Sequence, residues 1–148
     1  MPPDNPLVGT WRLVSWENRG VADGGVSHPR GRDAVGYIMY GRDGHMSVAI
    51  SRPDRARFAA GDLLGGSAEE RARAAETFVS YCGRYELRGK TVVHFVELSL
   101  FPNWIGAEQE RLVEVEGDRL ILSTRPMVLG GVQRTAHLIW ERVRTAER

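Results

Sequence analysis

Apolar and polar residues alternate through most of the chain, and short turns divide it into segments of strand length. Alternation with period two is typical of strands buried on one face, and a glycine-containing turn between two such segments predicts a hairpin. A first segment covers 7–17, three hairpins turn at Asp43-Gly44, Arg88-Gly89 and Glu116-Gly117, and a last segment covers 132–143. The sequence therefore predicts eight strands, with a short extra strand at 25–28.

The connections between these strands alternate between long and tight. In an up-and-down sheet, successive connections lie at opposite ends, so all the long ones fall at one end. This layout is typical of a closed barrel with a sealed base and a loop-covered mouth, whose interior holds side chains or one small ligand. We therefore predict an all-β fold, an eight-stranded up-and-down antiparallel barrel formed by one domain over 1–148. The long connections are 18–33, 52–80, 101–107 and 125–131.

One helix interrupts the strands. Ser67 and Glu70 have the spacing of a capping box, in which each side chain binds a free backbone N–H of the other residue. Small and apolar residues follow at helical spacing up to Val79, so we expect a helix over 67–79. The preceding segment 52–66 either covers the barrel mouth as a lid or packs on this helix.

Two tryptophans of the first strand, Trp11 and Trp16, are five residues apart, so a regular strand places them on opposite faces. The strand starts at the sealed end, which puts Trp11 at the barrel floor, and Gly9 permits a close approach of neighbouring chain. The last strand returns to the same end and brings Arg142 near Trp11, where a guanidinium can stack on the indole. Trp16 is then expected on the outer face.

Composition excludes several functional classes. A net charge of +1 in 148 residues, with both signs interspersed, favours neither nucleic acid nor an anionic membrane as a partner. A single cysteine, Cys82, excludes an intramolecular disulfide and indicates a reducing compartment. No signal region and no long apolar stretch is found, so we expect a cytoplasmic protein. The four histidines have no metal-ligand spacing, and we expect no metal and no cofactor; monomer and homodimer both stay open.

Specific runs of sequence resemble a known family. Gly9-Thr10-Trp11, with an arginine in the last strand, resembles the Gly-x-Trp signature of lipocalins and related barrels. The runs GYIMYGRDGHMSV and YCGRYELRGKTVVHFVELSLFPNWIGAEQERL are similar to the bacterial lipocalin-like domain family. This resemblance covers nearly the whole chain and implies a calycin-type barrel around a small-molecule pocket. It implies no defined catalytic set, because related barrels include carriers as well as cyclases and isomerases.

The tight turns predict which side chains face the interior. Neighbouring residues of a strand point to opposite faces, and the more apolar face of each hairpin is placed inward. The loop around Trp104 is expected to close the mouth with large apolar groups. The predicted ligand-binding residues are Tyr37, Met39, Val48, Tyr81, Tyr85, His94, Leu98, Trp104, Gln109, Arg111 and Leu122.

Arg111 is the most informative of these residues. A charge away from water is costly unless it is paired, and the predicted inner face offers no acidic residue. A ligand oxygen, water at the mouth or a loop residue such as Asp62 could serve as its partner. His94 is either a structural histidine satisfied by hydrogen bonds or a functional one.

The sequence thus predicts a binding barrel for a small, largely apolar molecule with a polar or anionic handle. The alternative is a cofactor-independent cyclase, isomerase or dehydratase, in which Tyr81, His94 or Arg111 polarises the substrate or moves a proton.

Overall fold

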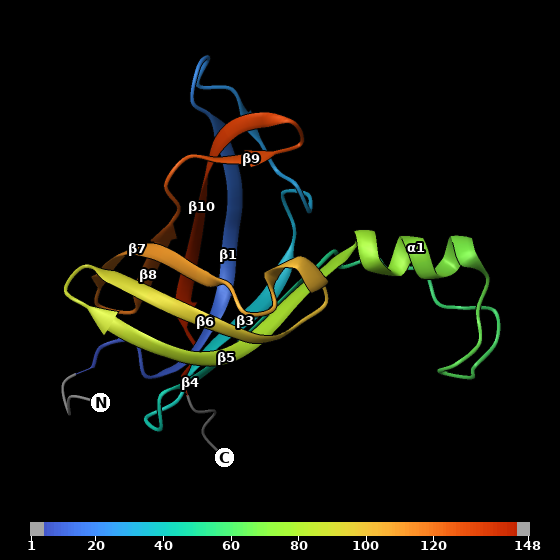
Figure 1. Cartoon of the computed structure of the whole chain (residues 1–148), viewed down its shortest axis with the longest axis horizontal. Helices are drawn as coiled ribbons and strands as arrows, with labels where there is room; N and C mark the ends of the chain where they lie inside the picture. Colours follow the sequence, from blue (N-terminus) through green and yellow to red (C-terminus); the bar gives the residue numbers. More distant parts are fainter. Residues whose placement is uncertain (1–4, 145–148) are drawn as a thin grey trace.

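The computed structural model describes residues 5–144, which form ten strands, one α-helix and one short 3-10 helix (Figure 1). In chain order they are β1 (Gly9–Gly20), β2 (Val26–Ser27), β3 (Val35–Tyr40), β4 (His45–Ser51), α1 (Ala68–Glu76), β5 (Phe78–Arg88), β6 (Thr91–Ser99), η1 (Pro102–Trp104), β7 (Glu108–Glu116), β8 (Arg119–Ser123), β9 (Met127–Leu129) and β10 (Val132–Arg142).

Eight of these strands close into an antiparallel barrel, as the sequence predicts. They are hydrogen-bonded in the order β1-β3-β4-β5-β6-β7-β8-β10, and β10 pairs with β1 to close the ring. The short strand β2 pairs with β1, as expected near 25–28, whereas β9 is an unexpected strand that pairs with β10. All four long connections lie at one end of the barrel and the three tight turns lie at the other.

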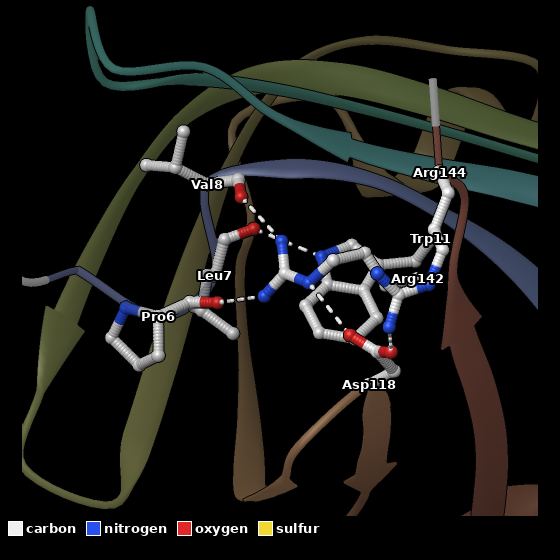
Figure 2. A network of polar contacts seen from close by, with 7 residues as sticks. All are labelled: Pro6, Leu7, Val8, Trp11, Asp118, Arg142 and Arg144. Atoms are coloured by element: carbon white, nitrogen blue, oxygen red, sulfur yellow. Dashed lines mark hydrogen bonds and ion pairs between the residues drawn. The ribbon is translucent and has the colours of Figure 1, made fainter. Parts of the chain in front are cut away.

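The closed end is sealed by Trp11, which is fully buried (Figure 2). The guanidinium of Arg142 lies over its indole, 4.2 Å from the ring centroid, and donates hydrogen bonds of 3.0 Å to the carbonyl oxygens of Val8 and Pro6. Asp118 pairs with Arg142, with 3.7 Å between carboxylate and Nε, and also contacts Arg144. This confirms the predicted floor of the barrel.

The outward position predicted for Trp16 is wrong. The pairing of β1 with β10 shifts by one residue between Leu13 and Ser15, so Val14 is an extra residue. A bulge of this kind reverses the facing of every residue beyond it. Trp16 therefore points into the barrel, where it packs against the core and donates from Nε1 to Asn18.

The inward positions predicted for Tyr37 and Met39 are also wrong, because the first hairpin has a longer turn than expected. Tyr40 pairs with Met46, and Gly44 takes a left-handed conformation with φ of +88°. The residues between this pair are 41–45, whereas the prediction has a turn of 41–44. The one extra residue exchanges the two faces of β3. Tyr37 and Met39 are 45% and 47% exposed, and Ile38 and Tyr40 are buried instead.

Leu98 is likewise misplaced by the prediction. Gly83 pairs with Val96 but Cys82 pairs with Leu98, so Glu97 is an extra residue of β6. The strand faces reverse at that bulge, and Leu98 is 68% exposed on the outside of the barrel. Between the bulge and the tight turn, each side chain keeps the face that the sequence predicts, and His94 therefore points inward.

The helix is shorter than predicted and projects away from the barrel (Figure 1). The capping box of Ser67 and Glu70 is present, but α1 ends at Glu76, and Phe78 and Val79 belong to β5. No residue of α1 is buried. The segment 52–66 packs along this helix, as Ala59 donates to the Glu70 carboxylate, and its Leu63 and Leu64 are exposed. The segment therefore contacts the helix, as one of the two alternatives expects, whereas a role as a lid over the mouth stays a prediction.

Candidate functional site

The barrel encloses an inner cavity of about 90 Å³ that continues toward the mouth. An outer cavity of about 510 Å³ shares four of its lining residues, Trp16, Val79, Trp104 and Leu129. The inner cavity is lined by Trp16, Ile38, Val48, Ile50, Val79, Tyr81, His94, Trp104, Arg111, Leu122, Met127, Leu129, Ala136, Leu138 and Trp140. Most of these side chains are apolar, so the inner cavity suits an apolar molecule with few polar groups.

The structure brings six of the predicted ligand-binding residues to this cavity: Val48, Tyr81, His94, Trp104, Arg111 and Leu122. Tyr85 and Gln109 are buried but lie outside its lining. Tyr85 is bound near the closed end, where it donates to the carbonyl oxygen of Gly41 and accepts from Asn5. Contact of the six lining residues with a ligand stays a prediction.

The polar end of the inner cavity is built around His94, which is 1% exposed. Its Nε2 lies 2.7 Å from the Oη of Tyr40, and its Nδ1 lies 2.7 Å from the Oη of Tyr81. Tyr40 comes from β3, His94 from β6 and Tyr81 from β5. Strand pairing holds the three rings in place, because β3 pairs with β4, β4 with β5 and β5 with β6. Tyr81 lines the cavity, whereas Tyr40 lies behind His94.

Burial sets the protonation of these three groups. Burial, together with the positive charge of Arg111, lowers the pKa of His94 to about 3, so the imidazole is neutral near pH 7. Burial also raises the pKa of Tyr40 well above its usual value, with a further contribution from Tyr81. The pKa of Tyr81 is raised by burial, against the opposing charge of Arg111. All three groups are therefore uncharged.

Arg111 lies on the cavity wall beside this group. It donates to the Oε1 of Gln109 at 3.1 Å and to the carbonyl oxygen of Glu110 at 3.0 Å. Within residues 5–144 it forms no ion pair, and Asp62, named above as a conceivable partner, binds the backbone N–H of Leu64 instead. A guanidinium has five N–H donors, so Arg111 retains donors for a further acceptor.

Trp104 lies at the boundary between the two cavities. Its ring meets the ring of Tyr81 edge to face, with centroids 5.8 Å apart, and packs in the same way on Phe101 at 5.4 Å. Pro102 begins the 3-10 turn that carries it. The indole therefore lines both cavities.

Several lining residues were absent from the sequence prediction. The hairpin turn that places Tyr37 and Met39 outward brings Ile38 to the lining, and the bulge at Val14 brings Trp16 there. Met127 and Leu129 belong to β9, which carries no alternation long enough to predict a strand. Ala136, Leu138 and Trp140 alternate on β10, and this period-two pattern could have identified them.

Among residues 5–144, no group of three or more His, Cys, Asp or Glu side chains is placed to hold a metal ion. In the same part of the chain, neither helix has the length and apolar character that crossing a membrane requires.

The fold and the cavity together define a lipocalin-like barrel. The sequence model of the lipocalin-like domain family matches residues 8–143, and the chain belongs to this family.

A curated relative is the 4'-hydroxy-3'-methoxypropiophenone carrier protein ppsC of Aspergillus oryzae (strain ATCC 42149 / RIB 40). It is 36% identical over 107 residues, which cover 66% of this chain and 96% of the relative. Among solved structures, the lipoprotein YedD of Klebsiella pneumoniae subsp. pneumoniae MGH 78578 has a TM-score of 0.43 at 11% identity, over 98% of this chain and 78% of that one. That structural likeness is too low to bear on function.

Proposed function

We propose that this protein binds, as a carrier, a small and largely apolar molecule whose polar handle is held by Arg111 and Tyr81. The observation that carries the proposal is the enclosed apolar cavity with polar groups gathered at one side. The carrier relative supports it, because that protein is named for an aryl ketone, an apolar ring system with acceptor oxygens.

The size of the two cavities favours a ligand that occupies both. The inner cavity, at about 90 Å³, is smaller than the roughly 150 Å³ void that admits benzene in an engineered protein. A ligand of one substituted ring therefore extends from the polar end past Trp104 into the outer cavity. Adaptable side chains such as Met127 line that path.

The alternative function, a cofactor-independent cyclase, isomerase or dehydratase, needs a group that gives up or takes a proton near neutral pH. His94 has a pKa of about 3, and burial raises the pKa of both tyrosines bound to it. These shifts favour hydrogen bonding over proton transfer at this site. They support binding over catalysis.

The test is titration of the purified protein with 4'-hydroxy-3'-methoxypropiophenone and a panel of apolar ketones, carboxylic acids and hydrocarbons, by calorimetry and native mass spectrometry. We expect a one-to-one complex with at least one oxygen-bearing member. Failure of the entire panel, or turnover of a bound member into a product, contradicts the carrier proposal.

A pair of variants links binding to the cavity. Ala136→Leu adds volume inside the barrel, where Ala136 is 5% exposed, and we expect it to abolish binding while the fold is retained. Met39→Ala changes an exposed side chain on the outer face and serves as the matched control. Equal affinity of both variants would place the ligand outside the barrel. The cytoplasmic location and a single domain over 1–148 stay part of this proposal.

A further inference from the structure

The polar side chains that line the inner cavity offer hydrogen-bond donors. Arg111 is a donor at every nitrogen, and Trp140, fully buried, has an Nε1 atom without a partner among the described residues. Both ring nitrogens of His94 are occupied by tyrosines. No carboxylate or side-chain amide is among the residues 5–144 that line this cavity. The one group whose role is open is the hydroxyl of Tyr81, which can donate or accept.

The role of the Tyr81 hydroxyl depends on the tautomer of His94. A neutral imidazole carries one N–H and one lone pair, so one of the two tyrosines donates to it and the other accepts from it. If Nε2 carried the hydrogen, the hydroxyl hydrogen of Tyr40 would have no acceptor within residues 5–144, in a fully buried position. Leaving a buried donor without a partner is costly.

The opposite tautomer satisfies both ring nitrogens and Tyr40, and leaves only a hydrogen that faces the cavity. Tyr40 then donates to Nε2, and the Nδ1–H of His94 donates to the oxygen of Tyr81. The hydroxyl hydrogen of Tyr81 is left free on the cavity side, where Arg111 also lies. Since a tyrosine oxygen that accepts from a neighbour becomes a better donor, this chain strengthens the hydrogen bond that Tyr81 can offer.

We propose that the inner cavity is a donor-only site, specific for a ligand with an acceptor oxygen such as a ketone or carboxylate, and that Tyr40 is the positioning residue that fixes Tyr81 as a donor. The ligand part rests on the proposed function. Molecules whose only polar group in this place is a donor, such as an ammonium group, are excluded because Arg111 repels or fails to satisfy them.

The tautomer of His94 tests this proposal without any ligand. Long-range proton–nitrogen correlation spectra of protein labelled with ¹⁵N-histidine distinguish Nδ1–H from Nε2–H, and the signals absent in His94→Gln identify this residue. We expect Nδ1–H at neutral pH in the parent protein, and a mixture of tautomers in Tyr40→Phe. A parent protein with Nε2–H would overturn the proposal.

A matched pair of probes tests the ligand class. In 2-methoxy-4-propylphenol, a methylene group replaces the carbonyl of 4'-hydroxy-3'-methoxypropiophenone, and the rest of the molecule is the same. We expect the ketone to bind at least about fivefold more tightly. Tyr81→Phe should reduce that difference, with Arg111 left as the remaining donor, and leave the affinity for the methylene probe unchanged. Tyr37→Phe removes the same hydroxyl from the outer face and should change neither affinity.

The two proposals fail in different ways. If neither probe binds, the proposed function is contradicted for this class of ligand. The ligand part of the donor-only proposal is then contradicted as well, because it rests on that function. If both probes bind with equal affinity, the carrier function stands and the donor-only site is wrong. If Tyr81→Phe weakens both probes equally, or weakens neither, the Tyr81 hydroxyl does not donate to the ketone oxygen, which also overturns the donor assignment.

Discussion

Arg142 lies over the indole of Trp11, with its guanidinium carbon 4.2 Å from the ring centroid, and the two residues are direct partners across β1 and β10 (Figure 2). A Cβ atom on Gly9 would come within 3.0 Å of the Arg142 guanidinium, so the glycine leaves room for the arginine. The Nε1 of Trp11 also donates to the carbonyl oxygen of Leu7 at 2.9 Å. These contacts join the start of β1 to the end of β10 at the floor of the barrel.

Trp11→Ala should lower the free energy of unfolding by about 3–5 kcal/mol, because it removes a fully buried aromatic side chain and the surface on which Arg142 stacks. Urea denaturation measures this loss. Arg12→Ala, on the same strand as Trp11, is the control: it removes an exposed ion pair with Glu141 of β10 and should cost less than about 1 kcal/mol. Similar midpoints for parent and Trp11→Ala would contradict the sealed floor.

Gly83→Ala should destabilise the barrel by about 3 kcal/mol or more, because a Cβ atom at this position would lie 1.9 Å from the backbone oxygen of Phe95. Backbone atoms in a paired strand cannot move aside cheaply, and Gly83 lies next to the bulge of β6. Thermal unfolding followed by circular dichroism tests this. Gly61→Ala, at a position with open space, should stay within about 0.5 kcal/mol of the parent.

The sequence predicted the barrel and its sealed base because those depend on loop lengths and on tight turns, which are visible in the chain. It also placed His94, Arg111 and Leu122 correctly, since no bulge separates them from their turns. The second hairpin turns at Gly89-Lys90 and not at the predicted Arg88-Gly89. A turn displaced by one residue changes the strand pairing by two positions, so every side chain stays on its predicted face.

The errors arise where one extra residue enters a strand or a turn. Val14 in β1, Glu97 in β6 and the longer turn at Gly44 each reverse a face, which moves Trp16 inward and Leu98, Tyr37 and Met39 outward. The pattern gives no warning of these changes, because GYIMY is apolar on both faces and VELSL keeps a regular alternation across the bulge at Glu97. Tyr40, and with it the hydrogen-bonded group around His94, could not be predicted for this reason.

Trp104→Phe should remove a large part of any change in tryptophan fluorescence on ligand binding, because Trp104 lies between the two cavities and contacts Tyr81. Trp16 and Trp140 also line the inner cavity, so a smaller signal should remain. Titration of parent and variant with the same ligand measures both. A signal of undiminished size in Trp104→Phe would place the ligand away from the mouth loop.

Stability should depend on pH through His94. Its pKa is about 3 in the folded protein, against 6.5 for an ordinary histidine, so the unfolded chain binds more protons between these values. The free energy of unfolding should therefore fall as pH falls from about 6.5 toward 3, by up to about 1.4 kcal/mol per pH unit, and stay level through this group above 6.5.

Denaturant unfolding at several pH values, compared with His94→Gln, isolates this contribution. The glutamine has a donor and an acceptor for the two tyrosines but no proton to gain, so its profile should be flatter in that range. Burial also lowers the pKa of His137, and His137→Asn controls for the part that it adds. Parallel profiles for the parent protein and His94→Gln would show that His94 does not stay neutral.

Arg111→Met should separate ligand binding from stability. Methionine keeps the length of the side chain and removes the charge, and within residues 5–144 Arg111 has no carboxylate partner that would be left unpaired; its acceptors are the Gln109 amide and the Glu110 carbonyl. We therefore expect an unfolding free energy equal to that of the parent or higher, and a loss of about 1.5–3 kcal/mol in affinity for a ketone or carboxylate ligand, the scale of a hydrogen bond to a charged group. Arg125→Met, which removes an exposed pair with Glu110 on the outer side, should change neither quantity. Calorimetry and thermal unfolding on one preparation measure both. A destabilised variant with unchanged affinity would assign Arg111 a purely structural role.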